Sequence, residues 1–168
     1  NGEVNPSGRL VDIYARNFKQ DPTFANFATN YASAYTTEAG GTTGINFVEY
    51  DEGIYIGYRY YETRGYVEGG SWYEDNVVYP FGYGMSYTTF SKKVNFVTKS
   101  LTADGSIDVD VTVTNTGKTA GKEVEQLYYS APYTDGEIEK SHIVLGAYEK
   151  TDLLQPGMSQ KLRLTMKV

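Results

Sequence analysis

Carboxylic acids gather between residues 49 and 75, and their types could support the hydrolysis of a glycosidic bond. A retaining mechanism needs two carboxyls about 5–5.5 Å apart, one as the nucleophile and one as the acid/base. The acids that could supply such a pair are Glu49, Asp51, Glu52, Glu62, Glu68, Glu74 and Asp75. Adjacent residues in a strand point to opposite faces, so a neighbouring pair of acids is no evidence for this arrangement. Glu52 is the best catalytic candidate, and the simpler interpretation makes Glu52 and Arg59 local hydrogen-bonding or ion-pair partners.

The aromatic residues of the same region suggest a binding surface. Residues 50–90 contain more than half of the chain's 17 tyrosines and its single tryptophan. These side chains have an apolar body and a polar tip, which matches sugars with apolar C–H faces and surrounding hydroxyls. Trp72 and Tyr73 are expected in an exposed loop as an aromatic wall beside a sugar, with Arg64 or Glu74 bonding hydroxyl groups. The alternative is a hydrophobic plug against another domain, because an exposed apolar patch normally marks an interaction site.

Composition argues against several other functions. With 15 basic and 21 acidic residues, the net charge is −6, which disfavours nucleic acid and anionic membrane surfaces. Cysteine is absent and His142 is the only histidine, so we predict no metal site, and we predict no cofactor. Gly82 and Gly84 lack the full spacing of a phosphate-binding loop and indicate a tight bend instead. No apolar run approaches the roughly 20 residues of a membrane span.

The first half of the chain has a mixed pattern. A short apolar run at residues 10–14 is typical of a strand, and residues 36–44 form a loop. Asp21-Pro22 predicts a helix start, and one face of that helix would carry Phe24, Phe27, Ala28 and Tyr31. Residues 54–61 could be a strand or a helix.

After residue 90 the apolar residues alternate with polar ones, which is typical of half-buried strands. The clearest example is residues 107–114, and a type II turn is expected at Pro156-Gly157. Further strands are expected at residues 94–98, 124–129, 143–147 and 162–168. These segments predict a mainly β protein, an immunoglobulin- or fibronectin type III-like β-sandwich preceded by an irregular α/β segment. Such a sandwich has about seven strands, so we expect it to lack its last strands.

Ordered motifs along the chain resemble those of family 3 glycoside hydrolases, which are mostly β-glucosidases. The first set is NPSGRL at residues 5–10, EGIYIGYRYY at 52–61 and YPFGYGMSYTTF at 79–90. A second set resembles the fibronectin type III-like module of the same enzymes, at residues 111–117, 120–124, 126–128 and 153–157. The resemblance covers nearly the whole chain.

This resemblance implies a domain layout and the place of the catalytic groups. Residues 1–85 would be the C-terminal part of an α/β sandwich domain, and residues 86–168 a fibronectin type III-like domain that is incomplete at its C-terminus. The family's (β/α)8 barrel, which supplies the nucleophilic Asp, would be missing, and so would its acid/base Glu. No catalytic residue is therefore expected in this chain.

We thus predict a non-catalytic structural portion of a retaining β-glucosidase-like enzyme. Its partners would be the missing barrel and, through the parent enzyme, a β-linked glucoside or oligosaccharide. The alternatives are a stand-alone carbohydrate-binding or protein-interaction module, or an enzyme in its own right that uses Glu52. Self-association is expected through a strand edge at Val168 or through the tyrosine-rich surface. The chain begins at Asn1 rather than Met, which indicates an excised piece and leaves a bacterial cytoplasmic or a secreted location open.

Overall fold

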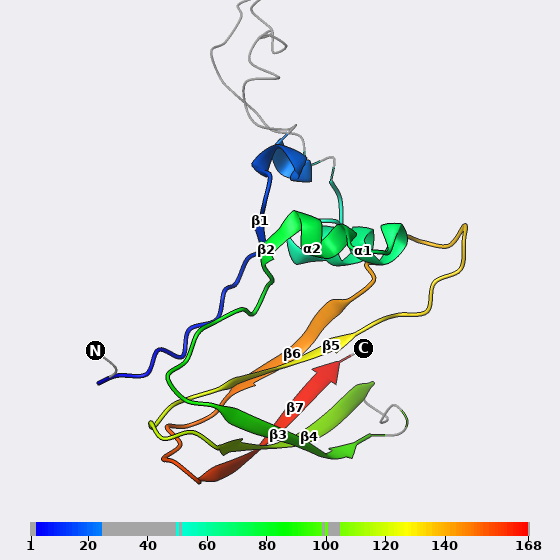
Figure 1. Cartoon of the computed structure of the whole chain (residues 1–168). Helices are drawn as coiled ribbons and strands as arrows, with labels where there is room; N and C mark the ends of the chain where they lie inside the picture. The colour runs from blue at the N-terminus through cyan, green and yellow to red at the C-terminus, as the bar shows by residue number, and fades with distance from the viewer. Residues whose placement is uncertain (1–2, 25–49, 51, 99, 101–104, 168) are drawn as a thin grey trace, which may run out of the picture. The chain divides into compact units, whose positions relative to one another are not determined.

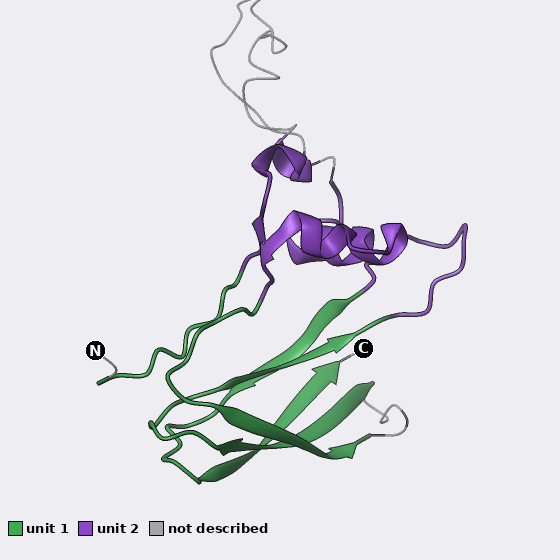
Figure 2. Ribbon diagram, in the orientation of Figure 1, with its two compact units in different colours: residues 1–11, 82–130, 143–168 green, residues 12–81, 131–142 purple. Residues whose placement is uncertain are grey.

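The computed structural model describes residues 3–24, 50, 52–98, 100 and 105–167. The chain divides into two compact units, which are coloured separately in Figure 2. Unit 1 comprises residues 1–11, 82–130 and 143–168, and unit 2 comprises residues 12–81 and 131–142. The predicted division at residues 85 and 86 stays a prediction.

Unit 1 consists of two antiparallel sheets that face each other (Figure 1). One sheet has three strands in the order β3 (Phe90–Val97), β4 (Ser106–Asn115) and β7 (Ser159–Lys167). The other pairs β5 (Val124–Tyr129) with β6 (Val144–Lys150). The prediction of a mainly β, sandwich-like fold is confirmed.

The core of unit 1 comes from the alternating residues of its strands. One face of β4 and β7, together with the β6–β7 connection, buries Val109, Val111, Val113, Leu154, Leu162 and Leu164. Leu127 of β5 and Ala147 of β6 pack against this cluster from the second sheet. Burying one such aliphatic side chain contributes about 1.5–3 kcal/mol, so a few alternating residues can stabilise the fold.

A buried asparagine connects the loops at one end of the sandwich. Asn115 is completely buried, and its Nδ2 donates to the carbonyl oxygens of Thr119 and Leu154, both at 2.8 Å. Its Oδ1 accepts from Thr88 Oγ1 at 2.7 Å and from the Gly117 amide at 3.0 Å. These bonds satisfy the amide, as a buried polar group requires.

The turn expected at Pro156-Gly157 is present. The Met158 amide donates to the Gln155 carbonyl at 2.9 Å, and Gly157 has a φ of 80°. This left-handed backbone is the requirement of the third residue of a type II turn, and glycine adopts it without steric cost. The prediction from the Pro-Gly pair is confirmed.

Asp110 lies on the outer face of β4, opposite the core side, and is nevertheless only 2% exposed. Arg163 donates to both Asp110 oxygens, at 2.7 and 3.0 Å, and Lys161 Nζ lies 2.8 Å from Oδ2. The long basic side chains of β7 cover the shorter acid across the strand pair. Their hydrogen bonds hold the pKa of Asp110 well below its usual range.

The first motif, residues 5–10, is held against residues 82–87 within unit 1. Asn5 Oδ1 accepts from the Tyr87 amide at 2.7 Å, and the Leu10 amide donates to the Tyr83 carbonyl at 2.8 Å. A Cβ at Gly84 would overlap the carbonyl oxygen of Gly8, so this close approach requires glycine. Two motifs that are far apart in sequence therefore form one structural element.

The longest regular element in the described part of unit 2 is a helix. Two short strands, β1 (Tyr14–Ala15) and β2 (Val77–Tyr79), form an antiparallel pair. Two 3-10 turns, η1 (Phe18–Gln20) and η2 (Pro22–Phe24), follow β1. Helix α1 (Tyr58–Glu68) and the short helix α2 (Trp72–Asn76) complete the unit. No helix in the described residues is long and apolar enough to span a membrane.

The structure of residues 10–61 differs from the sequence predictions at several points. Of the strand expected at residues 10–14, only Tyr14 lies in a strand, because β1 is limited to the two residues that pair with β2. Residues 54–61, for which the sequence allowed a strand or a helix, include the start of helix α1 at Tyr58. A turn over residues 52–54 precedes it. A 3-10 turn begins after Asp21, whose Oδ1 accepts from the Thr23 amide at 3.0 Å. The rest of that expected helix, with Phe27, Ala28 and Tyr31, and the loop at 36–44 lie outside the described residues.

Candidate functional site

Arg64 is the centre of a polar and aromatic cluster on unit 2. Tyr60, Arg64 and Glu68 are spaced by four residues along α1, so their side chains lie on one face of the helix. Arg64 Nη1 donates to Tyr60 Oη, and Arg64 Nε donates to Glu68 Oε1 at 3.4 Å. The hydrogen bond to Tyr60 is the main cause of the raised pKa of Arg64. The guanidinium is thus charged and held in one orientation.

Trp72, the first residue of α2, adds a second ring to this cluster. The Arg64 Cζ lies 5.2 Å from the centre of the Trp72 ring and 5.7 Å from that of Tyr60. These distances fit cation–π contacts, which prefer a cation within about 6 Å of the ring centre. Gly69 and Gly70 reverse the chain between the helices with φ values of 66° and 58°. The Gly-Gly pair therefore places Trp72 beside Arg64.

The side chain of Tyr73 contacts different residues from that of its neighbour Trp72. Its Oη donates to Glu62 Oε1 at 2.7 Å, and its ring packs against Gly65 of α1. Trp72 and Tyr73 lie in a short helix and are half-buried. The expectation of an exposed loop is wrong here, because α2 packs against α1.

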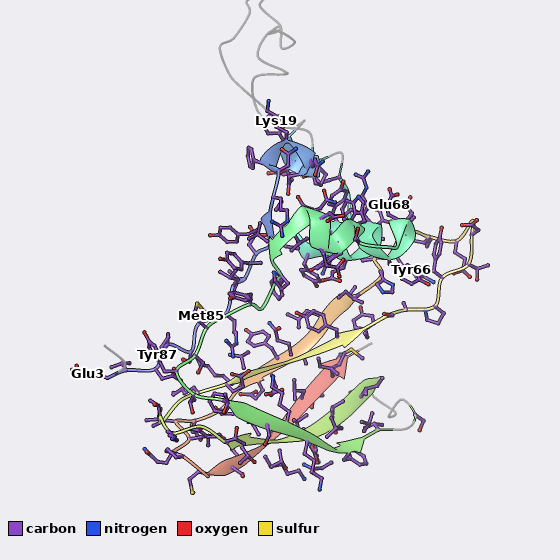
Figure 3. The ribbon with its side chains drawn as sticks, viewed as in Figure 1. Glu3, Lys19, Tyr66, Glu68, Met85 and Tyr87 are labelled. Carbon is purple, nitrogen blue, oxygen red and sulfur yellow. The ribbon has the colours of Figure 1, made fainter. Side chains whose placement is uncertain are left out.

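The surface side of the cluster is accessible. The side chains of Arg64 and Glu68 are 47% and 48% exposed, and Figure 3 shows Glu68 at the end of α1. An oriented guanidinium and a carboxylate offer hydrogen bonds for sugar hydroxyls, and aromatic side chains lie beside them. The structure brings Arg64 and Trp72 together, as the sequence suggested. Tyr60 was not predicted, although its four-residue spacing from Arg64 is a signal for it.

Tyr61 is the buried neighbour of this cluster. It is 1% exposed, its ring lies 6.3 Å from Trp72, and its Oη donates to Asp21 Oδ2 at 3.4 Å. Burial, aided by the negative charge of Asp21, raises the pKa of Tyr61 above its usual value. The phenol is therefore neutral and structural.

Glu52, the catalytic candidate, lies in the turn that precedes α1. Its backbone carbonyl accepts from the Tyr55 amide at 3.0 Å, which closes that turn. Its pairing with Arg59 stays a prediction, as does a catalytic role. Within the described residues, no three His, Asp or Glu side chains are grouped so that they could hold a metal ion.

A second polar site lies in unit 1, in a cleft of about 480 Å³ beside β5. Its charged lining residues are Arg9, Lys92, Glu123 and Glu125. Arg9 Nη2 pairs with Glu123 Oε2, while Lys92 Nζ lies 3.2 Å from Glu123 Oε1 and 3.3 Å from Glu125 Oε1. Sequence reasoning missed this site, although the two-residue spacing of Glu123 and Glu125 at the start of β5 was a signal.

This cleft holds two carboxylates, but its geometry does not suit glycoside hydrolysis. Retention needs the reacting sugar carbon between the two carboxyls. Here the Lys92 ammonium lies within 3.3 Å of both of them and occupies that place. Burial raises the pKa of Glu125, against the opposing effect of Lys92. The four side chains form a neutral ionic network that links β3, β5 and the first motif.

Comparison with known proteins identifies similar sequences and folds along nearly the whole chain. "Beta-glucosidase A" of Butyrivibrio fibrisolvens is 42% identical over 177 residues, covering 98% of this chain and 19% of that protein. A β-glucosidase structure from Paenibacillus barengoltzii has a TM-score of 0.77 at 41% identity, with 98% of this chain and 15% of that one covered. β-Glucosidase 3B of Thermotoga neapolitana, in complex with α-D-glucose, has a TM-score of 0.72 at 36% identity, with 98% and 20% covered. No protein-family model matches the chain.

Proposed function

This chain belongs to the family 3 glycoside hydrolases, and we propose that it forms a non-catalytic, structural portion of a retaining β-glucosidase. The main support for this proposal is that the chain spans only 15–20% of the length of the relatives compared above. The parent enzyme would hydrolyse terminal β-linked glucose. In it, residues 1–85 would end the α/β sandwich domain and residues 86–168 would form the fibronectin type III-like domain.

The contacts of the described carboxylates support a non-catalytic role. Glu62 accepts from Tyr73, Glu68 accepts from Arg64, and Glu123 and Glu125 share Lys92. Carboxyls that are already committed to such structural partners are poor nucleophiles. The sandwich would instead brace the domains that carry the catalytic groups.

An activity assay tests this role. We expect the purified 168-residue chain to release no phenol from an aryl β-glucoside, while the parent enzyme does. Turnover by the chain that Glu52→Gln abolishes, and that the exposed control Glu149→Gln preserves, would overturn the proposal. Turnover would then have to come from a carboxyl within these residues.

The contact between the exposed Arg64 and the half-buried Trp72 supports a second candidate function, a carbohydrate-binding module. Trp72 is the only tryptophan, so its fluorescence reports directly on this surface. A saturable change on titration with glucose, cellobiose or laminaribiose, lost in Arg64→Met, would favour binding. No change at millimolar sugar would favour the scaffold.

A further inference from the structure

The outer face of the β3–β4–β7 sheet is positively charged, although the protein is acidic. Exposed residues alternate with buried ones along β7, so the exposed set points away from the core. Lys93 lies opposite Thr112, and Thr112 lies opposite Lys161, and residues that lie opposite one another point to the same face. Four cations and two acids give this face a net charge of +2, whereas the whole chain has −6. The charged residues that the described strands place there are Lys93, Lys161, Arg163, Lys167, Asp108 and Asp110.

Arg163 is held in place on this face by a buried acid. Its Nε and Nη2 donate to the two oxygens of Asp110, and its side chain is still 59% exposed. Its Nη1 lies 3.9 Å from Asp108 Oδ2, which is beyond hydrogen-bonding distance. A guanidinium has five N–H donors in a planar fork, so donors other than the two that bond Asp110 remain for a second carboxylate.

Two lysines add ammonium groups to the same face as this arginine. Lys161 Nζ lies 2.8 Å from Asp110 Oδ2, and the Lys161 side chain is 60% exposed. Lys93 lies two strands away, which places its Cα roughly 10 Å from that of Lys161. The residue opposite Lys93 is Thr112, not an acid. The single charge of Asp110 thus faces both Arg163 and Lys161, and positive charge remains on the surface.

A β-bulge turns one aromatic ring outward onto this face. Phe96 follows Val94, which lies on the core side, by two residues and would also point to the core in a regular strand. The register shifts between the two residues, so Phe96 lies opposite Asp110 on the outer face and is 49% exposed. The intervening Asn95 donates to Thr112 Oγ1 at 2.5 Å. Bulges re-aim side chains next to functional sites, and this one places a phenyl ring among the cations.

We propose that the outer face of this sheet binds an acidic polysaccharide. A uronate residue of such a glycan has a carboxylate that can bind the Arg163 guanidinium and the neighbouring ammonium groups. The same sugar has an apolar C–H face that can pack on the Phe96 ring. One ligand therefore accounts for both features of the surface, the cations and the exposed ring. The inference goes beyond the proposed function, and neither depends on the other.

Other anionic partners fit this face less well. A nucleic acid duplex or an anionic membrane presents a broad negative surface, which would also approach the acidic residues elsewhere on the chain. Three strands at their usual spacing give a face only roughly 10 Å wide between the outer strand axes. A single glycan chain can follow such a narrow face and contact its cations without covering the rest of the molecule.

Titration of the 168-residue chain with polygalacturonate tests the proposal. Isothermal titration calorimetry should show saturable binding that weakens as the salt concentration rises, because the contacts are ionic. Methyl-esterified polygalacturonate keeps the sugars without the charge, and polyglutamate keeps the carboxylates without the sugars. Each should bind at least about tenfold more weakly, since each lacks one of the two kinds of contact. No saturable binding of polygalacturonate, or equal binding of DNA, phosphatidylserine vesicles or either control polymer, would overturn the proposal.

Substitutions on the outer face locate the binding site. Arg163→Gln should weaken polygalacturonate binding at least about tenfold, because a charged hydrogen-bond donor is lost. This variant also removes a partner of the buried Asp110 and can affect folding. Lys93→Gln and Phe96→Ala leave the Arg163–Asp110 pair intact and provide the second measurement. Each should weaken binding about threefold, through the loss of an exposed charge or of an aromatic contact.

Matched control variants carry the same changes outside this face. Lys122→Gln removes an exposed lysine that precedes β5, and Tyr148→Ala removes an aromatic ring of β6 that is 70% exposed. Both should leave the affinity for polygalacturonate unchanged. Control variants that lose as much affinity as Lys93→Gln and Phe96→Ala, or outer-face variants that lose none, would overturn the proposal.

Discussion

Units 1 and 2 of this chain are stabilised by different kinds of contact. In unit 1 alternating aliphatic residues form a core cluster, and ionic networks such as Arg163–Asp110 flank it. In the described part of unit 2, aromatic rings stack on one another and on arginine, as in Tyr61–Trp72 and Arg64–Trp72. Aliphatic cores depend on volume, whereas aromatic and cationic contacts depend on orientation. The two units should therefore respond differently to mutation.

The largest effect is expected from a cavity in the unit 1 core. Leu164 is 3% exposed, and Leu164→Ala should lower the free energy of unfolding by roughly 2–5 kcal/mol, because lost burial and the cavity add. Urea denaturation followed by the circular dichroism of the strands measures it. The exposed control Leu153→Ala should change it by less than about 0.5 kcal/mol. Similar losses in the two variants would mean that the cluster is not a packed core.

A smaller effect is expected at the type II turn before β7. Gly157→Ala places a Cβ on a residue with a φ of 80° and should cost about 1–2 kcal/mol. Gly8→Ala is the control, because Gly8 has open space around its Cβ position and no left-handed backbone. Urea midpoints of the two variants provide the comparison, and an unaffected Gly157→Ala would argue against the turn.

The ionic network beside β5 predicts a pH dependence. Because burial raises the pKa of Glu125, the folded protein binds its proton more tightly than the unfolded chain does. Ionised Glu125 therefore destabilises the folded protein at pH values above its raised pKa. This destabilisation decreases once the pH falls below that pKa, because the carboxyl then takes up a proton. Glu125→Gln should be more stable than the wild type at pH 7, by less than the Gly157→Ala loss, and the difference should vanish in acid. Melting temperatures between pH 4 and pH 8 measure it, and a Gln variant that is less stable throughout would contradict this prediction.

The smallest effect is expected in the aromatic cluster of unit 2. Arg64→Lys keeps the charge but loses the planar group that bonds Tyr60 and covers Trp72, and should cost about 0.5–1 kcal/mol. Trp72 fluorescence during denaturation reports this change. A loss as large as that of Leu164→Ala would remove the distinction between the two units.

The strands of unit 1 could be predicted because apolar and polar side chains alternate in β4 and β7 and apolar residues predominate in β5. The expected segment at residues 124–129 matches β5, and the segment at 107–114 lies within β4. Helix α1 could not be predicted in the same way, since Tyr61 is the only buried residue among its eleven. Its tyrosines and arginines form no apolar stripe, so no period distinguishes a helix from a strand.

The candidate sites show the same limit. Trp72 and Arg64 were recognised as residue types suited to sugars, but their proximity depends on the reversal at Gly69-Gly70. Arg9, Lys92 and Glu123 are far apart in sequence, and none was predicted as part of a site. They meet because the first motif is held against residues 82–87 and because β3 and β5 lie in facing sheets.

The amino-acid sequence by itself determined the strand segments, the type II turn and the family, because alternation, turn chemistry and ordered motifs are local properties of the chain. The tertiary structure decided which charges are buried and which carboxylates share a lysine. Those properties depend on long-range packing, which sets the distance and the dielectric environment between residues that the sequence keeps apart.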